Sequence, residues 1–319
     1  MYKLLIVRIL FLLGLLSFQS INVFAQKQKV WFDTDMGNEM DDIFALTRLL
    51  VEADKYDIVG VSSAHFNNAD LLVFDKWNQY PTKGINTVKI SQDENEKVLD
   101  AFKMMNILHP MGADRQMGRA WGEYTPRPSD MTKNLIEVVQ KLPEGERLDV
   151  IFIGAATNIA SAIAIEPSIA KKMRLFCMGG KYDAKEKIWN KDEFNVRGDL
   201  NAINYLFNNQ DIEWYIMPFE TCIVLTFDRE DTYARLNSKY PVENLLKQRW
   251  IASNPDDKTR IIWDLAAVEA YLSPNLAKVK AVKTPPENHQ HRVNVYTKID
   301  KEAMFNRFWG TLQAYREKK

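Results

Sequence analysis

Cysteine, histidine and an excess of basic charge are all scarce in this chain. Its 319 residues include 2 Cys and 4 His, and Lys plus Arg equal Asp plus Glu at 42 each. Two cysteines cannot make a disulfide framework, although Cys177 and Cys222 could form one bridge in an oxidising compartment. Cys177 lies inside an apolar run, which favours a buried thiol. The balanced charge lacks the basic footprint of a nucleic-acid binder, so a small-molecule substrate is favoured.

Several catalytic signatures are also missing. The chain contains no Gly-x-Ser-x-Gly, no phosphate-binding loop, no Cys-x-x-Cys and no His-Glu-x-x-His. Each of these motifs places a nucleophile, a phosphate cradle or a metal ligand at a fixed spacing. Their absence leaves the corresponding chemistries without support.

The first 25 residues are expected to be a signal peptide. Lys3 and Arg8 precede an apolar run, and Val23 and Ala25 put small residues at the −3 and −1 positions of a cleavage site before Gln26. The apolar run is about half of the ~20 residues needed to span a bilayer, which argues against a membrane anchor. With no Cys near the cleavage point, a lipoprotein is not favoured either. We therefore expect an exported protein, periplasmic or extracellular, with no membrane attachment after cleavage.

What the chain does have is an acidic stretch, Asp33-Thr-Asp-Met-Gly-Asn-Glu-Met-Asp-Asp42, directly after the apolar run Val30-Trp-Phe32. Five carboxylates within ten residues repel one another unless a cation or protons neutralise them. Oxygen ligands favour hard ions such as Ca²⁺ or Mg²⁺. An acidic turn that caps a helix is the alternative, but capping needs one or two acids. The stretch therefore predicts a divalent-metal site.

The order of elements in residues 26–319 predicts one α/β domain. β-rich runs alternate with helical patterns, which favours an open, largely parallel central sheet with flanking helices. Residues 228–262 are rich in charge and without clear strands, so we expect a helical lid or insertion there. The expected strands are 29–32, 57–63, 149–154, 174–178, 213–217, 278–283 and 292–297, and the expected helices include 41–53, 159–165 and 301–316.

Polar side chains recur where these strands end. Ligands bind at the carboxyl edge of open α/β sheets, so groups that follow different strands are expected to converge there. Each also has a simpler role: Asn67 fits a turn, and Thr157 and Asp264 fit helix N-caps. The segments that qualify are Ser62 to Asn68, Gly154 to Asn158, Gly179-Gly180, Asp192 to Asn195, and Trp263-Asp264.

This ordered series resembles the inosine-uridine-preferring nucleoside hydrolases. That family opens with Asp-x-Asp-x-Gly and a later Asp-Asp pair, and continues with Gly-Asn, Gly-Pro-Leu-Thr-Asn, Gly-Gly, Glu-Phe-Asn and His-Asp-Pro. The matching segments run from Val30 to about Pro274, and Glu193-Phe-Asn195 matches outright. The resemblance implies that the substrate is a small ribosyl N-glycoside. It leaves the nucleobase open and is compatible with a homo-oligomer.

The resemblance also implies roles for single residues. Asp35 would be the general base for a Ca²⁺-bound water that attacks the anomeric carbon, and anionic groups would stabilise an oxocarbenium-like state. The implied Ca²⁺ ligands are Asp35, Asp42, the backbone carbonyl of Thr157, and Asp264. The residues implied to hold ribose hydroxyls are Asp41, Asn67, Glu193 and Asn195.

One departure from the family pattern bears on catalysis. Trp263 stands where the family has a His before the last Asp, and an indole cannot donate a catalytic proton at neutral pH. Trp263 could instead stack on a base or close the pocket. His65, two residues before Asn67, is the best replacement acid. A non-catalytic or altered ribosyl-binding protein is therefore the second hypothesis, and a Mg²⁺-dependent phosphatase built on Asp33 and Asp35 is the third.

Overall fold

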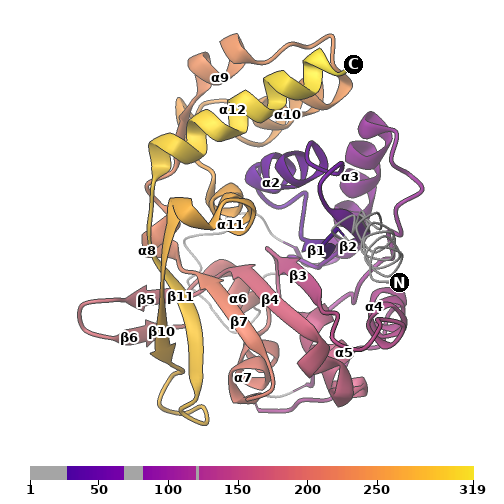
Figure 1. Cartoon of the computed structure of the whole chain (residues 1–319), viewed down its shortest axis with the longest axis vertical. Coiled ribbons are helices and arrows are strands. Elements are labelled where there is room, and N and C mark those ends of the chain that lie inside the picture. The colour runs from indigo at the N-terminus through magenta and orange to yellow at the C-terminus, as the bar shows by residue number, and fades with distance from the viewer. Residues whose placement is uncertain (1–26, 68–81, 120–121) are drawn as a thin grey trace, which may run out of the picture.

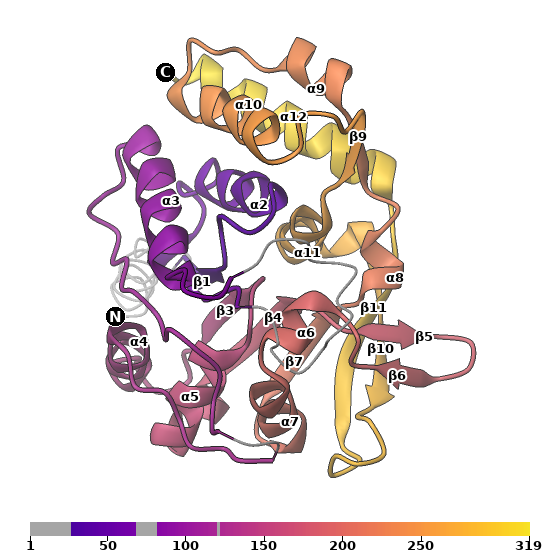
Figure 2. The same ribbon diagram turned by 180° about the vertical axis from the view of Figure 1, so that it is seen from behind.

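The computed structural model describes residues 27–67, 82–119 and 122–319. Its centre is a seven-stranded sheet of order β10-β11-β7-β4-β3-β1-β2, with helices on both faces (Figures 1 and 2). All neighbours are parallel except β10 and β11. The strands are β1 (Lys29–Thr34), β2 (Asp57–Ser63), β3 (Leu148–Phe152), β4 (Met173–Met178), β7 (Glu213–Met217), β10 (Ala277–Lys283) and β11 (Arg292–Ile299). The predicted fold class is confirmed.

The side chains of the central strands alternate between the two faces of the sheet, and each face forms its own hydrophobic core. Phe32 of β1 packs with α2, α3, α11 and α12 on one face, whereas its neighbour Trp31 packs with α4, α5 and α7 on the other. Successive side chains of a strand point to opposite faces, so apolar residues at every position are buried when both faces are covered. These helices are α2 (Asp41–Leu50), α3 (Thr87–Phe102), α4 (Asp130–Gln140), α5 (Thr157–Ile165), α7 (Leu200–Asn208), α11 (Trp263–Leu272) and α12 (Lys301–Glu317).

The segment 228–262 contains two helices and one short strand. Helices α9 (Arg229–Arg235) and α10 (Pro241–Ser253) are followed by β9 (Thr259–Ile261), which pairs with β8 (Thr226–Asp228). The three-residue strand β9 was not expected, because it is too short to show an alternating pattern. Helix α10 packs against α2 and α3, on the side of these two helices that faces away from the sheet (Figures 1 and 2).

A hairpin and two short helices lie near the carboxyl ends of β4 and β7. A hairpin of β5 (Lys181–Asp183) and β6 (Ile188–Asn190) projects from the body of the protein (Figure 2). Helices α6 (Phe194–Gly198) and α8 (Phe219–Cys222) follow β6 and β7. The two cysteines, Cys177 and Cys222, are both buried and free, so the optional disulfide does not form.

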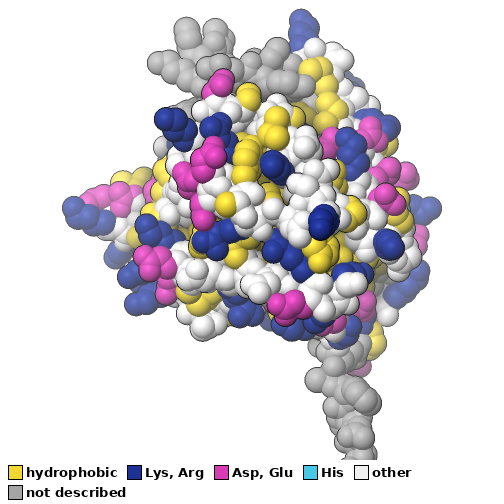
Figure 3. Space-filling model, turned by 90° about the horizontal axis from the view of Figure 1, so that it is seen from above, with side chains coloured by type: hydrophobic (Ala, Val, Ile, Leu, Met, Phe, Trp, Pro, Cys, Tyr) yellow, Lys and Arg dark blue, Asp and Glu magenta, His cyan; other side chains and the backbone are white. Residues whose placement is uncertain are grey.

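The surface shows no single dominant charge on the face seen in Figure 3, where acidic and basic side chains are interspersed with hydrophobic ones. None of the helices within residues 27–67, 82–119 and 122–319 combines the length and the apolar character that a membrane span requires. The predicted signal peptide, residues 1–25, lies outside the described residues.

Candidate active site

A cleft of about 870 Å³, including its open mouth, lies where the carboxyl ends of the parallel strands meet. The strands are in register here: Asp33 of β1 is level with Ser62 of β2 and Phe152 of β3. The loops that leave the strands therefore converge on one place, as the sequence predicts. The predicted site residues that line the cleft are Asp35, Asp41, Asp42, Glu193, Asn195, Trp263 and Asp264.

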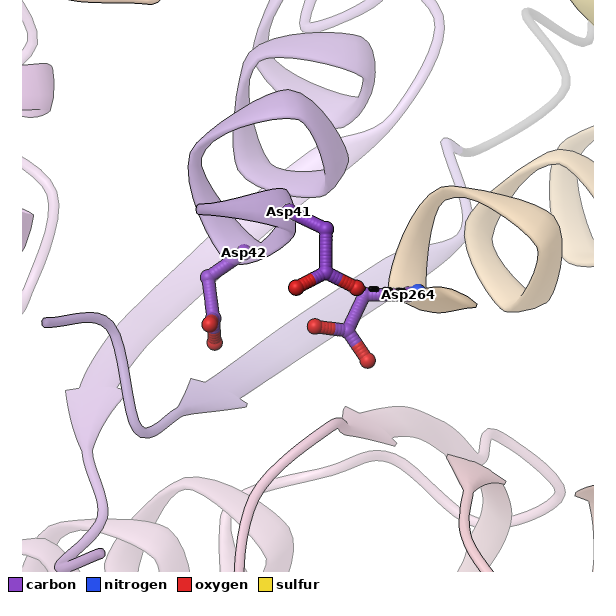
Figure 4. Close-up of side chains that lie close together, drawn as sticks. All are labelled: Asp41, Asp42 and Asp264. Atoms are coloured by element: carbon purple, nitrogen blue, oxygen red, sulfur yellow. Dashed lines mark hydrogen bonds between the residues drawn. The ribbon is translucent and has the colours of Figure 1, made fainter. Parts of the chain in front are cut away.

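Three aspartates form the acidic centre of the cleft. Carboxylate oxygens of Asp41, Asp42 and Asp264 lie within 4.8 Å of one another, and all three residues are buried. Figure 4 shows them converging from the first turns of α2 and α11. Asp41 Oδ2 accepts a hydrogen bond of 3.0 Å from the backbone N–H of Asp264, which ties the two helix N-termini together. Asp42 accepts a bond from the Thr34 hydroxyl.

Asp35 lies beside this cluster, on the loop that follows β1. It is buried, and its Oδ2 has no hydrogen-bond partner. The approach of β3 to Asp35 depends on Gly154, since a Cβ there would come within 2.8 Å of the Asp35 Cβ. A buried carboxylate oxygen without a donor is unfavourable unless a proton or a cation faces it. The loop geometry thus leaves one oxygen available to an ion or a ligand.

The electrostatics of the four carboxyls agree with a cation site. Burial, followed by the charges of Asp42 and Asp41, raises the pKa of Asp35 well above its usual value. Burial and then Asp41 raise the pKa of Asp42 to about 7. Burial and then the neighbouring carboxylates raise the pKa of Asp264 well above its usual value. Four acids that share a buried space cannot all ionise without a compensating charge, so the residues fit a hard divalent ion.

Two arginines from the segment 228–262 reach the acidic loop. Arg249 of α10 donates to the carbonyl of Glu39, and Arg260 of β9 forms an ion pair with the Glu39 carboxylate. The Arg260 guanidinium also lies 5.5 Å from the centre of the Trp263 ring. These contacts hold the acidic loop and Trp263 in place. They act from outside the cleft, because none of the described residues between Arg229 and Ile262 lines it.

Glu193 and Asn195 form the opposite wall, at the start of α6. The sequence suggested a strand or loop here, but Glu193 is the N-cap of a short helix. Its carboxylate accepts from the backbone N–H groups of Asn195, Val196 and Gly180. The Asn195 side chain donates to the Ile153 carbonyl at 2.7 Å. Because these bonds fix both side chains, the wall is pre-organised for a polar ligand.

Three predicted site residues do not line the cleft. Thr157 lies in the first turn of α5, and its hydroxyl donates to Asp199 Oδ2 at 2.6 Å. That hydroxyl therefore accepts from His65 Nε2, 2.9 Å away, and His65 Nδ1 accepts from the backbone N–H of Asn67. The Asn67 side chain bonds to the Asp114 carbonyl and the Thr87 hydroxyl. In this network His65 is neutral with its proton on Nε2.

Replacing His65 by Ala is expected to lower stability rather than turnover. Burial lowers the pKa of His65 to about 4, from an ordinary 6.5. Loss of its two hydrogen bonds should reduce the free energy of unfolding by about 2 kcal/mol at pH 7.5. The unfolded chain binds the extra proton between about pH 6.5 and pH 4, so His65 contributes least at low pH and the difference from wild type should shrink there. Urea unfolding at several pH values measures this, whereas a rate loss confined to poor leaving groups would make His65 the acid.

The sequence did not point to several residues that line the cleft. Ile153 directly follows β3, and its carbonyl can accept a second interaction besides Asn195. Phe219 of α8 adds apolar surface. Lys181 and Arg197 add positive charge. Only the Gly179-Gly180 turn before Lys181 and the Glu193-Phe-Asn195 motif before Arg197 mark these positions in the sequence.

No curated protein matches this chain in sequence. Among solved structures, an inosine-guanosine nucleoside hydrolase superposes with a TM-score of 0.66 at 14% identity, covering 90% of this chain and 98% of the other. The inosine-uridine preferring nucleoside hydrolase of Bacillus anthracis gives a TM-score of 0.62 at 18% identity, covering 92% and 100%. The effector protein XOO4466 gives 0.66 at 15%, covering 91% and 94%.

These structural likenesses show the fold alone, and the sequence carries the assignment. The family model described as inosine-uridine preferring nucleoside hydrolase matches residues 30–306. This range includes each residue that lines the cleft. The chain therefore belongs to the inosine-uridine preferring nucleoside hydrolase family, a family of hydrolases.

Proposed function

We propose that this protein hydrolyses the N-glycosidic bond of ribonucleosides with the help of Ca²⁺, and that Asp35 is the general base. The observation that carries the proposal is the buried, unpartnered Oδ2 of Asp35 beside the cluster of Asp41, Asp42 and Asp264. The family membership supplies the reaction class.

The ion would be held by Asp35, Asp42 and Asp264. For the backbone ligand we favour the carbonyl of Ile153 over that of Thr157, because Ile153 lines the cleft and Thr157 does not. An all-oxygen donor set suits Ca²⁺. When bound, the ion supplies positive charge that relieves the repulsion among the carboxylates and lowers the pKa of water.

The side chains of the cleft have complementary tasks. Asp35 Oδ2 would take the proton of the attacking water while the water oxygen bonds to the anomeric carbon and the C–N bond breaks, its electron pair going to the base nitrogen. Asp41, Glu193 and Asn195 would accept from or donate to the ribose hydroxyls. The buried carboxylates also favour the positive charge that develops on the sugar.

Trp263, which stands where the family has a His, cannot donate a proton to the leaving group. Its indole N–H is buried without a hydrogen-bond partner, and an indole does not give up this proton at neutral pH. Trp263 is suited to pack against the nucleobase, with Arg260 against its ring. We therefore expect turnover to favour bases that leave without protonation by the enzyme.

Purified residues 26–319 should release free ribose from a nucleoside panel in Ca²⁺ and stop when a chelator is added. The ion should also raise the melting temperature, because it binds the folded state alone. Reducing-sugar assays and thermal melts measure the two effects. Turnover that survives complete chelation, verified by metal analysis, would rule out the metal-dependent reaction.

The second candidate is a ribosyl-binding protein without catalysis, favoured by Trp263 and by the position of His65 outside the cleft. Inactivity across the panel, with Ca²⁺ and ribose-containing ligands still bound in calorimetry, would select it. Release of inorganic phosphate from sugar phosphates would select the phosphatase. We further propose export with cleavage before Gln26, which N-terminal sequencing of the protein from its native host would test.

A further inference from the structure

Glu39 lines the cleft, and the proposed reaction gives it no task. It lies in the acidic stretch, two residues before Asp41. The aspartates that converge within the cleft are Asp41, Asp42 and Asp264, and Glu39 is not part of that group. Its carboxylate pairs with Arg260 instead. Glu39 is therefore available for another role in the same cleft.

Two arginines fix Glu39 from outside the cleft. The Arg260 guanidinium pairs with Oε2 of the Glu39 carboxylate and with Asp257 at 3.1 Å. Arg249 donates to the Glu39 carbonyl. The Arg260 side chain is 16% exposed, whereas the Glu39 side chain is 41% exposed and lines the cleft. Because one oxygen is anchored, the carboxylate is held in position while part of it remains open to a ligand.

The second carboxylate oxygen, Oε1, is the part that remains open. The hydrogen bond from Arg260 reaches Oε2, and no hydrogen bond from a described residue reaches Oε1. An ionised carboxylate only accepts hydrogen bonds, so Oε1 can bind a ligand N–H but repels a ligand carbonyl. Burial raises the pKa of Glu39 to about 7, and the Arg260 charge opposes that rise. The carboxylate is therefore the main form at pH 8.

The same arginine links Glu39 to the ring proposed to pack against the nucleobase. The Arg260 guanidinium lies over the Trp263 indole, 5.5 Å from the ring centre. One guanidinium thus bridges the Glu39 carboxylate and the indole, both of which line the cleft. Glu193 and Asn195, proposed to hold the ribose hydroxyls, form the opposite wall. A nucleobase that packs on Trp263 would therefore turn its polar edge toward Glu39.

We propose that Glu39 selects the nucleobase: its Oε1 accepts from an exocyclic amino group, so the preferred substrates are ribonucleosides of an amino-bearing base, adenine or cytosine. The inference rests on the proposed function and names its substrate class. Hypoxanthine and uracil carry a carbonyl oxygen at the corresponding position, and that oxygen would face the carboxylate without a donor. A charge-assisted hydrogen bond of this kind supports discrimination of about tenfold or more.

The test compares residues 26–319 at pH 8 in Ca²⁺ on two matched pairs, adenosine with inosine and cytidine with uridine, with ribose release as the readout. Glu39→Gln keeps the shape of the side chain but can donate to a carbonyl. It should lower the amino-to-keto ratio of kcat/KM by about tenfold in at least one pair. Comparing the variant with wild type cancels the intrinsic reactivity of each base. Glu230→Gln is the matched control and should keep both ratios, because Glu230 pairs with Arg229 on the surface and does not line the cleft.

A second readout separates this inference from the proposed function. Calorimetric titration into Asp35→Asn measures nucleoside binding without turnover. Adenosine or cytidine should bind about tenfold more tightly than its keto partner, and Asp35→Asn/Glu39→Gln should lose that difference. This result without hydrolysis in wild type would uphold the role of Glu39 and reject the enzyme.

Hydrolysis with unchanged ratios in Glu39→Gln would do the reverse. Tighter binding of both keto nucleosides by Asp35→Asn would also overturn the inference, whether or not the Glu39 variants fold. Loss of Ca²⁺ binding in Glu39→Gln would overturn it as well, because Glu39 would then belong to the ion.

Discussion

Asp35→Asn is expected to lower kcat for nucleoside hydrolysis by about a thousandfold while the protein stays folded. The amide oxygen can still face a cation but cannot take a proton from water. In the metal-free protein the substitution should even raise the melting temperature. Burial and the carboxylates of Asp42 and Asp41 disfavour ionisation of Asp35, and Asn removes one of the repelling charges. Steady-state kinetics, thermal melts and Ca²⁺ titration together measure these effects.

The matched control is Asp33→Asn, two residues earlier in the chain. Asp33 is equally buried, but its carboxylate accepts from Ser62 and Asn158 and does not line the cleft. This variant should lose stability and keep kcat within a few-fold of wild type. Near-normal turnover in Asp35→Asn would remove Asp35 as the base. Loss of Ca²⁺ binding in parallel with turnover would assign Asp35 to the ion alone.

The sequence predicted the fold well because its strands are buried on both faces. Residues 57–63 form β2 as predicted, and each expected strand lies within β1, β3, β4, β7, β10 or β11 to within two residues. Apolar runs bounded by turn residues are a strong signal in a parallel sheet. The short strand β9 and helix α6 carry no such signal, since three to five residues show no periodicity.

The sequence predicted which side chains meet at the cleft where the chain itself brings them together, but not where tertiary contacts decide their position. The acidic loop, Glu193, Asn195 and Asp264 reach one cleft because they follow strands or begin helices at one edge of the sheet. Thr157 and His65 also follow strands, but their side chains bind each other and Asp199 and do not line the cleft. Asp199 lies 42 residues beyond Thr157, and no local sequence pattern predicts this contact.

Helices α2 and α11, which carry the three aspartates, are also joined by a buried ion cluster one to two helical turns after those aspartates. Arg48 of α2 pairs with Glu269 of α11 and with Glu52, and the side chains of Arg48 and Glu269 are fully buried. Arg307 of α12 lies 3.7 and 3.9 Å from the two glutamates. Burial raises the pKa of Glu269, and the Arg48 charge opposes that rise. The cluster thus links the position of Asp42 to that of Asp264 through the packing of α2 on α11.

Arg48→Met should lower the free energy of unfolding by about 3–5 kcal/mol, because it leaves Glu269 and Glu52 buried without their main cation. The double variant Arg48→Met/Glu269→Met should recover part of this loss, since it removes the uncompensated acid as well as the arginine. Guanidinium unfolding of the single and double variants measures the coupling.

Ca²⁺ titration of the folded variants tests the link between the ion cluster and the site. If the cluster sets the spacing of Asp42 and Asp264, Arg48→Met should bind Ca²⁺ more weakly than wild type, and the double variant should regain the affinity. A loss below about 1 kcal/mol in Arg48→Met would show that solvent reaches the glutamates and that the helices are held by their apolar contacts alone.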